Sequence, residues 1–317
     1  MAESSQDYEI KRRPEDFIVK EVSSIKPKEN GEYAYFLLKK RDYTTIKAID
    51  KIARFLKIPL KEIGFAGTKD KIAVTEQYIS IRDPLRKFEE RMKLFNIKDI
   101  SVSFIGRGDS PISLGDLKGN KFEIIAYSEK KPKKIGRFVN YFGEQRFSKN
   151  NIEIGKRIIK NELKEAAALI DNQKVKEYLK NHPNDFANAL RQLPQKILIL
   201  YIHSYQSYLW NRAAEELLKK VNNIEEDIEI DVLGFGTEFK EKKVREVYER
   251  IMKKEGISQR DFIIRNLPDL SSEGDKRKLF ERPIDLDIKE VEKGKHKIKF
   301  FLPKGCYATE LIRQMFS

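Results

Sequence analysis

The pattern of apolar residues changes twice along the chain, and this change limits the possible folds more than any other feature of the sequence. Short apolar runs typical of strands dominate up to about residue 150 and return after Ser271, whereas residues 152–255 repeat apolar side chains at helical spacing. Strands at both ends of a chain and helices between them predict an α+β domain interrupted by a mainly helical insertion. We therefore expect 1–151 and 276–317 to form one domain and 152–275 an inserted second domain.

Individual segments give the expected elements. Strands are predicted at 17–22, 33–38, 73–81, 102–105, 122–126, 284–288 and 297–302. Helices are predicted at 45–56, 85–95 and 308–315. In the middle of the chain one helical stripe comprises Ile154, Ile158, Leu163, Ala166, Ala167 and Ile170, and a second comprises Ile202, Tyr205, Leu209, Ala213 and Leu217.

The charge of the chain suggests a polyanionic partner. It contains 64 Lys and Arg against 50 Asp and Glu, which gives a formal net charge of +14. Lysine and arginine release condensed counterions when they meet phosphates, so this excess favours nucleic acid. Surfaces rich in Lys and Glu are also typical of heat-adapted proteins, which offers a second reason for the composition. No stretch approaches the roughly 18 apolar residues of a membrane helix, and the N-terminus lacks a signal-peptide core, so we expect a soluble, cytoplasmic protein.

Residues that commonly bind metals are few and scattered. The chain has one cysteine, Cys306, and three histidines, His182, His203 and His296. A single cysteine excludes a disulfide within the chain, and none of these residues has the spacing of a metal site. We expect no metal, and we expect Cys306 to be a small buried residue.

The most informative segment reads GFAGTKDKIAVTEQ at 64–77. Its two glycines allow a tight loop, and the loop ends in Asp70, between Lys69 and Lys71, just before a predicted strand. Neighbouring cations keep such a carboxylate ionised, so that it can act as a nucleophile or a base. A phosphate-binding P-loop is excluded because that motif needs four residues between its glycines and a helix after them. A surface hairpin with solvated charges is the alternative.

Four further segments combine aromatic and polar residues. The segment 140–147, NYFGEQRF, suits stacking on a base and holding a phosphate through Arg146, although its aromatic residues could equally belong to the core. Residues 130–134, KKPKK, predict a basic loop. His203 and Ser204 point to different faces of a helix, so core packing is the better interpretation of 203–211. Tyr307, in the turn before the last helix, is an aromatic wall or a core residue.

Seven segments in order along the chain carry a resemblance to one family. They are PEDFIVKE at 14–21, GTKDKIAVTEQ at 67–77, GNKF at 119–122, NYFGEQRF at 140–147, YQSYLWN at 205–211, SEGDKR at 272–277 and LPKGCYAT at 302–309. Together they resemble the TruD family of RNA pseudouridine synthases. The resemblance implies a catalytic domain around a mixed, largely antiparallel sheet, a family-specific insertion and RNA bound in the cleft between them. The chain departs from the family in Cys306, where Ser is commoner, and in its short insertion.

The resemblance also implies roles for individual residues. By position in the motifs, Asp70 would be the catalytic aspartate. Phe122 would stack on the target base, and Asn120 would help to position the loop or the base. Phe17 and Tyr307 match aromatic positions that line the pocket.

A basic partner for Asp70 is expected as well. Lys11, six residues before Phe17, is our candidate, with Lys69 and Arg12 as competitors. Lys69, Lys71 and Arg146 are candidates for contacts with RNA.

The expected activity is the isomerisation of a uridine in tRNA, typically at position 13, to pseudouridine by a monomer without cofactor or metal. Extruding the nucleotide costs a few kcal/mol, and stacking on Phe122 and its neighbours returns about 1–3 kcal/mol. The alternative is a non-catalytic basic protein that binds tRNA as a chaperone on the same scaffold.

Overall fold

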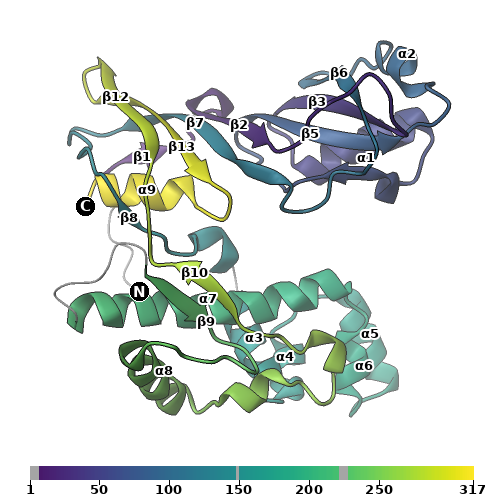
Figure 1. Ribbon diagram of the computed structural model, residues 1–317. Coiled ribbons are helices and arrows are strands. Elements are labelled where there is room, and N and C mark those ends of the chain that lie inside the picture. The colour runs from purple at the N-terminus through teal and green to yellow at the C-terminus, as the bar shows by residue number, and fades with distance from the viewer. Residues whose placement is uncertain (1–6, 148–149, 221–227) are drawn as a thin grey trace. The chain divides into compact units, whose positions relative to one another are not determined.

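The computed structural model describes residues 7–147, 150–220 and 228–317, and the chain divides into two compact units (Figure 1). The first unit comprises residues 1–138 and 282–317, and the second comprises residues 139–281. The structure is α+β, as predicted. The assignment of 152–275 to an inserted domain stays a prediction, whereas the second compact unit begins earlier and ends later.

The first unit is built on a mixed sheet in the order β12-β13-β7-β2-β5-β3-β6. These strands are β2 (Phe17–Ser23), β3 (Tyr33–Arg41), β5 (Val74–Arg82), β6 (Ile100–Gly108), β7 (Leu117–Tyr127), β12 (Ile284–Glu292) and β13 (Lys295–Pro303). Two short strands lie off this path: β1 (Glu9–Ile10) pairs with β7, and β4 (Ile63–Phe65) pairs with β5. Only β2 and β5 are parallel among the described pairs. The mixed, largely antiparallel sheet expected from the sequence is thus confirmed.

Two helices cover the same face of this sheet. Helix α1 (Thr45–Leu56) packs on β3, β5 and β6, and α9 (Ala308–Met315) packs on β2, β7 and β13. Strand register shows that the two helices lie on one face. Val19, which packs under α9, is the register partner of Thr75, so the two side chains point the same way. Ile79, four residues after Thr75 on β5, therefore shares this face, and it packs under α1. Thr44 caps α1 by accepting a hydrogen bond from Lys47 N. Both helices begin and end where the sequence predicts.

The remaining elements of the first unit are short. They are α2 (Phe88–Met92) and the 3-10 turns η1 (Pro14–Asp16) and η2 (Leu60–Glu62). Helix α2 lies inside the longer helix that was predicted at 85–95.

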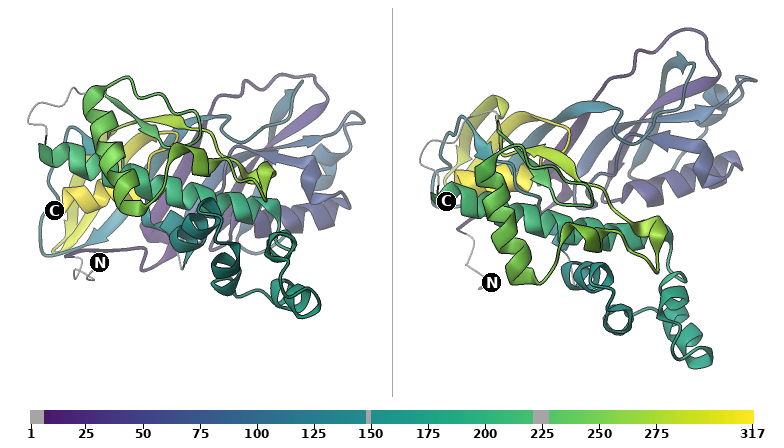
Figure 2. Two further views of the ribbon diagram at one scale, coloured as in Figure 1. Left: turned by 90° about the horizontal axis from the view of Figure 1, so that it is seen from below. Right: turned by 60° about the horizontal axis from the view of Figure 1, so that its bottom comes forward.

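The second unit is mainly helical and is centred on the long helix α7 (Gln195–Lys220), against which α3 (Asn151–Ile159) and α8 (Lys242–Glu255) pack (Figure 2). The smaller helices are α4 (Leu163–Ala168), α5 (Gln173–Asn181) and α6 (Phe186–Leu190), with 3-10 turns η3 (Glu144–Phe147), η4 (Gln259–Phe262) and η5 (Pro268–Leu270). Its largest buried side chains are Trp210, Tyr205 and Tyr248. No helix in the described ranges combines the length and apolar character needed to cross a membrane.

Two details of the second unit differ from the sequence prediction. The stripe from Ile154 to Ile170 is buried throughout but spans α3 and α4, because the chain turns at Asn161, whose φ is 60°. Strand β9 (Glu229–Val232), which was not predicted, pairs with β10 (Asp275–Lys278). The short strands β8 (Phe138–Val139) and β11 (Phe280–Glu281) pair where the chain leaves the first unit and returns to it.

Candidate active site

A strip of polar side chains crosses the middle of the covered face of the sheet, where β2 runs beside β5. Glu21, Lys40, Thr75 and Gln77 are all buried, although each continues a row of inward-facing apolar residues on its strand. Buried polar groups are costly unless they are bonded. Glu21, Lys40 and Gln77 are bonded, whereas Thr75 Oγ1 has no hydrogen-bond partner among the described residues. The three bonded members of the strip serve contacts with the segment above it. What lies above it is the loop that carries Asp70.

Four hydrogen bonds hold this loop in place, three from the strip and one from the start of α1. Thr45 Oγ1, at the start of α1, accepts from Lys69 N at 2.9 Å, and Gln77 Nε2 donates to Gly67 O at 3.1 Å. Lys40 Nζ donates to Asp70 O at 2.9 Å, and Lys69 Nζ donates to Glu21 Oε2 at 2.6 Å. The backbone around Asp70 is therefore fixed by the strands beneath it.

The Lys69–Glu21 ion pair is buried, with side-chain exposures of 7% and 0%. Glu21 Oε1 also accepts from Tyr78 N at 3.2 Å, which satisfies its second oxygen. This placement favours a role for Lys69 in holding the loop over a direct contact with RNA. Lys71, the other flanking lysine, is exposed.

Asp70 itself pairs with Lys11, as the sequence interpretation favoured. Lys11 Nζ lies 3.0 Å from Asp70 Oδ2, and the two side chains are only 18% and 24% exposed. The same ammonium lies over the ring of Phe17, 4.1 Å from its centroid, in a cation–π contact. The competitor Arg12 lies over Tyr127 instead and donates to Glu9.

The three phenylalanines beside this pair form a connected group. Phe17 contacts Phe122 edge to face at 6.2 Å between centroids, and Phe122 stacks on Phe300 at 5.2 Å. Val19 and Phe300 are the register partners of Phe122, so their side chains lie with that of Phe122 on the covered face. Phe17, two residues before Val19 on β2, points to the same face. Phe122 is half-buried, which leaves part of its ring accessible.

Asn120, two residues before Phe122 on the same face, has a buried Oδ1 without a hydrogen-bond partner among the described residues. An unpaired buried acceptor is rare in folded proteins, and one beside an aromatic surface suits a donor on a bound ligand. Tyr307 is half-buried and directly precedes α9, which covers this part of the sheet. Gly67 faces open space, which leaves room for a ligand beside the loop backbone.

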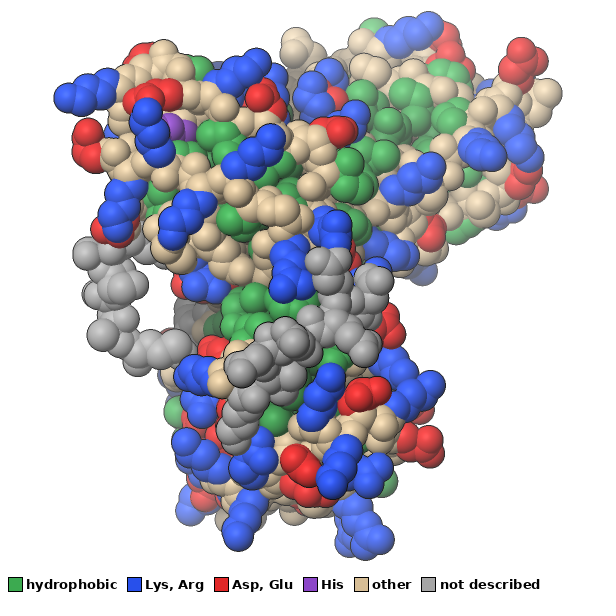
Figure 3. All heavy atoms as spheres, turned by 60° about the vertical axis from the view of Figure 1, so that its left-hand side comes forward, with side chains coloured by type: hydrophobic (Ala, Val, Ile, Leu, Met, Phe, Trp, Pro, Cys, Tyr) green, Lys and Arg blue, Asp and Glu red, His purple; other side chains and the backbone are tan. Residues whose placement is uncertain are grey.

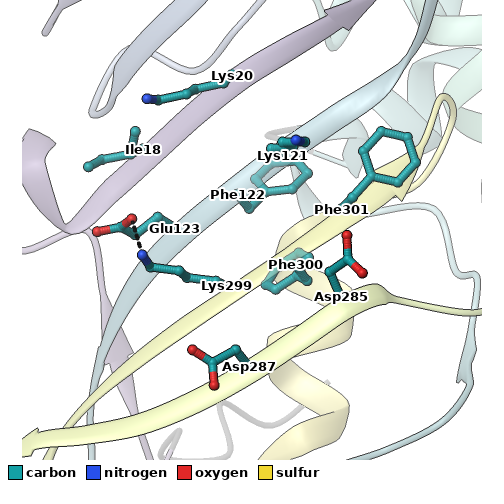
Figure 4. Close-up of a pocket in the computed structure, with 10 residues that line it drawn as sticks. All are labelled: Ile18, Lys20, Lys121, Phe122, Glu123, Asp285, Asp287, Lys299, Phe300 and Phe301. Atoms are coloured by element: carbon teal, nitrogen blue, oxygen red, sulfur yellow. Dashed lines mark ion pairs between the residues drawn. The ribbon is translucent and has the colours of Figure 1, made fainter.

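The pocket drawn in Figure 4 is a different place, although Phe122 contributes to its lining. It has a volume of about 330 Å³, and its side chains include Ile18, Lys20, Glu123 and Lys299. These residues alternate with Val19, Phe122 and Phe300, so they point to the opposite face of the sheet. Phe122 and Phe300 contribute to the lining of this pocket, whereas Lys11, Phe17 and Asp70 do not.

Three of the sequence motifs meet in the second unit. Phe142 N donates to Asn211 Oδ1 at 2.9 Å, and Asn211 Nδ2 donates back to Phe142 O at 3.0 Å. Arg277 lies over the Phe142 ring at 4.1 Å and donates to Asn140 Oδ1 at 2.7 Å. The segments 140–147, 205–211 and 272–277 thus form one packed cluster.

Arg146, the candidate phosphate contact of this cluster, is half-buried. Its Nη1 donates to Ser207 Oγ at 3.3 Å, and its guanidinium lies 5.0 Å from the Phe142 ring centroid. Ser204 bonds Arg146 O, so the hydroxyl near His203 serves the fold. Cys306 is partly buried against the core under α9. Among the described residues, no group of three His, Cys, Asp or Glu side chains is placed to hold a metal ion.

Comparison with solved structures gives the class to which this architecture belongs. The crystal structure of the "Putative tRNA pseudouridine synthase D (TruD)" of Methanosarcina mazei aligns with a TM-score of 0.74 and 26% sequence identity, over 99% of this chain and 94% of that one. The fold is thus that of a pseudouridine synthase.

Comparisons of the sequence give the family. The family model for tRNA pseudouridine synthase D (TruD) matches residues 3–177, 168–236 and 228–315. The tRNA pseudouridine synthase D of Aquifex aeolicus is 33% identical over 98% of both chains. A relative in Thermococcus sibiricus, named "Probable tRNA pseudouridine synthase D", is 30% identical over 96% of this chain and 94% of its own. The chain belongs to the TruD family, as its seven motifs suggested.

Polar side chains that sequence analysis missed complete the candidate site. Glu21, Lys40, Thr75 and Gln77 sit at strand positions that read as ordinary alternation. A signal was present, because Glu21 follows Phe17 and Val19 at a spacing of two and must share their inward direction. A charged residue on the inward side of a strand marks a buried polar contact.

Proposed function

We propose that this protein isomerises a uridine in tRNA to pseudouridine and that Asp70 is its catalytic aspartate. Membership of the TruD family supports the reaction and the substrate class. The observation that carries the residue assignment is the Asp70–Lys11 ion pair, held beside Phe17 on a loop fixed to the sheet. The resemblance to the family makes position 13 of the tRNA the expected target.

The chemistry requires a carboxylate at the sugar. The C1′–N1 bond breaks, the detached uracil rotates, and C5 joins C1′ before the proton on C5 is lost. Asp70 assists the first step either by attacking C1′ or by taking the proton on C2′. Lys11 orients the carboxylate, since its ammonium donates a hydrogen bond to Asp70 Oδ2 at 3.0 Å.

The nucleotide must leave its stack to reach this loop. Extrusion costs a few kcal/mol, and stacking on an aromatic surface returns about 1–3 kcal/mol per base. Phe122 and Tyr307, both half-buried, form the surface we assign to the flipped base, and the unpaired Oδ1 of Asn120 can accept a hydrogen bond from it. Phe17, expected from the sequence to line the same pocket, is only 1% exposed and supports the Phe122 ring by its edge-to-face contact. Lys71 and Arg146 are the proposed contacts to phosphate.

We also propose that the enzyme acts as a cytoplasmic monomer and that residues 152–275 form the inserted domain. Lysine and arginine side chains occur over both units on the face shown in Figure 3, interspersed with acidic ones. These positive charges suit contact with a folded RNA at many points rather than at one patch.

Mapping pseudouridine in unmodified tRNA after incubation with the purified protein tests this function. We expect one new pseudouridine per tRNA, at position 13. Binding of tRNA without any pseudouridine would contradict the proposal and support the non-catalytic chaperone instead.

A further inference from the structure

Lys40 occupies the fork where two strands separate below the Asp70 loop. The ladder between β3 and β5 ends at the pair Arg41 and Val74. Beyond that pair the two segments separate. The segment after β3 leads through Tyr43 to α1, and the segment before β5 comes from Asp70. The Lys40 side chain bridges the fork, because its ammonium donates to Tyr43 O at 2.6 Å and to Asp70 O at 2.9 Å.

The charge of Lys40 is costly where it lies. The residue is 2% exposed, and no acidic side chain of the described residues forms an ion pair with its ammonium. Burial lowers the pKa of Lys40 to about 8, with Asp70 opposing and Lys69 reinforcing that shift. Stability alone would favour an apolar side chain at such a position.

Lys11 meets the carboxylate of residue 70, and the hydrogen bonds from Gln77, Thr45 and Glu21 hold other residues of the loop. Gln77 holds Gly67, whereas Thr45 and Glu21 hold Lys69. Lys40 holds the backbone of residue 70 itself, and the carboxylate of that residue must meet its target within a few tenths of an ångström. A misplacement of about 1 Å can cost on the order of 100-fold in rate.

We propose that Lys40 is a positioning residue for Asp70: by fixing the carbonyl of residue 70 to the β3–α1 connection, its ammonium holds the carboxylate in the orientation that pairs with Lys11. This inference rests on the proposed function. Lys40 does not touch substrate in this account, so its loss affects turnover and leaves tRNA binding unchanged.

The test compares Lys40→Met with Lys39→Met. Lys39 is the adjacent residue on β3, is 50% exposed, faces the other side of the sheet and pairs with Glu76 at 3.1 Å. Both substitutions remove one positive charge from the same strand, so any general effect on RNA attraction is matched. We expect Lys40→Met to lower kcat about 10- to 100-fold with KM for tRNA within about twofold of wild type, and Lys39→Met to leave kcat unchanged.

A second variant keeps the test decisive if Lys40→Met does not fold. Lys40→Gln retains N–H donors on a side chain one bond shorter, which cannot span both carbonyls, so we expect kcat at least fivefold lower than wild type. Wild-type protein and Asp70→Asn are measured alongside. An inactive wild-type protein, or an Asp70→Asn variant that still turns over, would refute the proposed function. Active wild type, inactive Asp70→Asn and wild-type kcat in the folded Lys40 variants would overturn the role of Lys40 alone.

Discussion

Lys11 holds its ammonium against Asp70 from an unfavourable backbone conformation. Its φ of 61° lies in the left-handed region, which costs a residue other than glycine about 1–2 kcal/mol. Strained residues of this kind persist where the surrounding structure fixes them, and they concentrate at functional sites. At Lys11 the strain coincides with a partly buried ion pair and with the Phe17 ring, which supports its assignment as the partner of Asp70.

Removing the Phe122 ring tests the stacking surface. We expect Phe122→Ala to lower kcat about tenfold, since a base-stacking contact is worth about 1–3 kcal/mol, while the Kd for tRNA stays within about threefold. Single-turnover rates and filter binding measure the two effects. Phe104→Ala is the matched control, because Phe104 contacts Phe36 edge to face in the core under α1. Normal turnover in Phe122→Ala would show that the ring serves the core only.

The lowered pKa of Lys40 predicts how stability depends on pH. The folded state binds the Lys40 proton with a pKa of about 8, against 10.5 for an ordinary lysine. Between these values the unfolded chain binds more protons, so the contribution of Lys40 to stability becomes more favourable as pH rises. We expect the unfolding free energy of wild type, relative to Lys40→Met, to increase from pH 7.5 to pH 10 in urea titrations. A constant difference would contradict the buried charge.

At the scale of elements, the buried Lys69–Glu21 pair joins the Asp70 loop to β2. Removing one partner of a buried pair leaves an uncompensated charge, which costs about 3–5 kcal/mol. We therefore expect Glu21→Gln to lower the unfolding free energy by about 3 kcal/mol in urea denaturation. The exposed pair of Lys28 and Asp109 is the control, and Asp109→Asn should change stability by less than about 1 kcal/mol. Equal effects of the two substitutions would contradict the described burial of Glu21.

Elements with strong local signals could be predicted from the sequence. Helices α1 and α9 begin and end where predicted, because their amphipathic period is clear, and α1 is also capped by Thr44. Strand β9 was missed because four residues between helical segments carry too little periodicity. The division of one apolar stripe between α3 and α4 depends on the turn at Asn161, an asparagine in the left-handed conformation that ends α3 and that the sequence prediction did not use.

The candidate site could be predicted only in part, because its members come together through strand pairing. The loop motif and the family resemblance pointed to Asp70, and Lys11 was chosen among three basic residues. The buried contacts of Lys40 and Glu21 depend on which strands are neighbours and in what register. Register over long separations in sequence is not written in any local pattern.

At the scale of the whole molecule, two features matter: the pairing of strands that lie far apart in the sequence, and the net positive charge. The sheet of the first unit combines β7 with β13, which follows it after the entire second unit of 139–281. The net charge of +14 is spread over a chain with acids interspersed, so RNA binding should depend on many modest contacts with phosphate.

This distribution of charge predicts a strong dependence of binding on salt. Each neutralised phosphate releases counterions, so we expect the affinity for tRNA to fall at least about tenfold between 50 and 200 mM monovalent salt. Fluorescence anisotropy with labelled tRNA measures the slope of log Kd against log salt. A flat response over this range would contradict an interface built on phosphate contacts.

The release of tritium from tRNA labelled at C5 of uridine, compared between wild type and Asp70→Asn, tests the central assignment most directly. The substitution removes the charge and keeps the shape of the side chain. We predict stoichiometric release by wild type, no release above background by Asp70→Asn, and equal affinity of both proteins for tRNA within about twofold, since one side chain is a small part of a polyanion interface. Release by Asp70→Asn at a rate near that of wild type would contradict the assignment of Asp70 as the catalytic group.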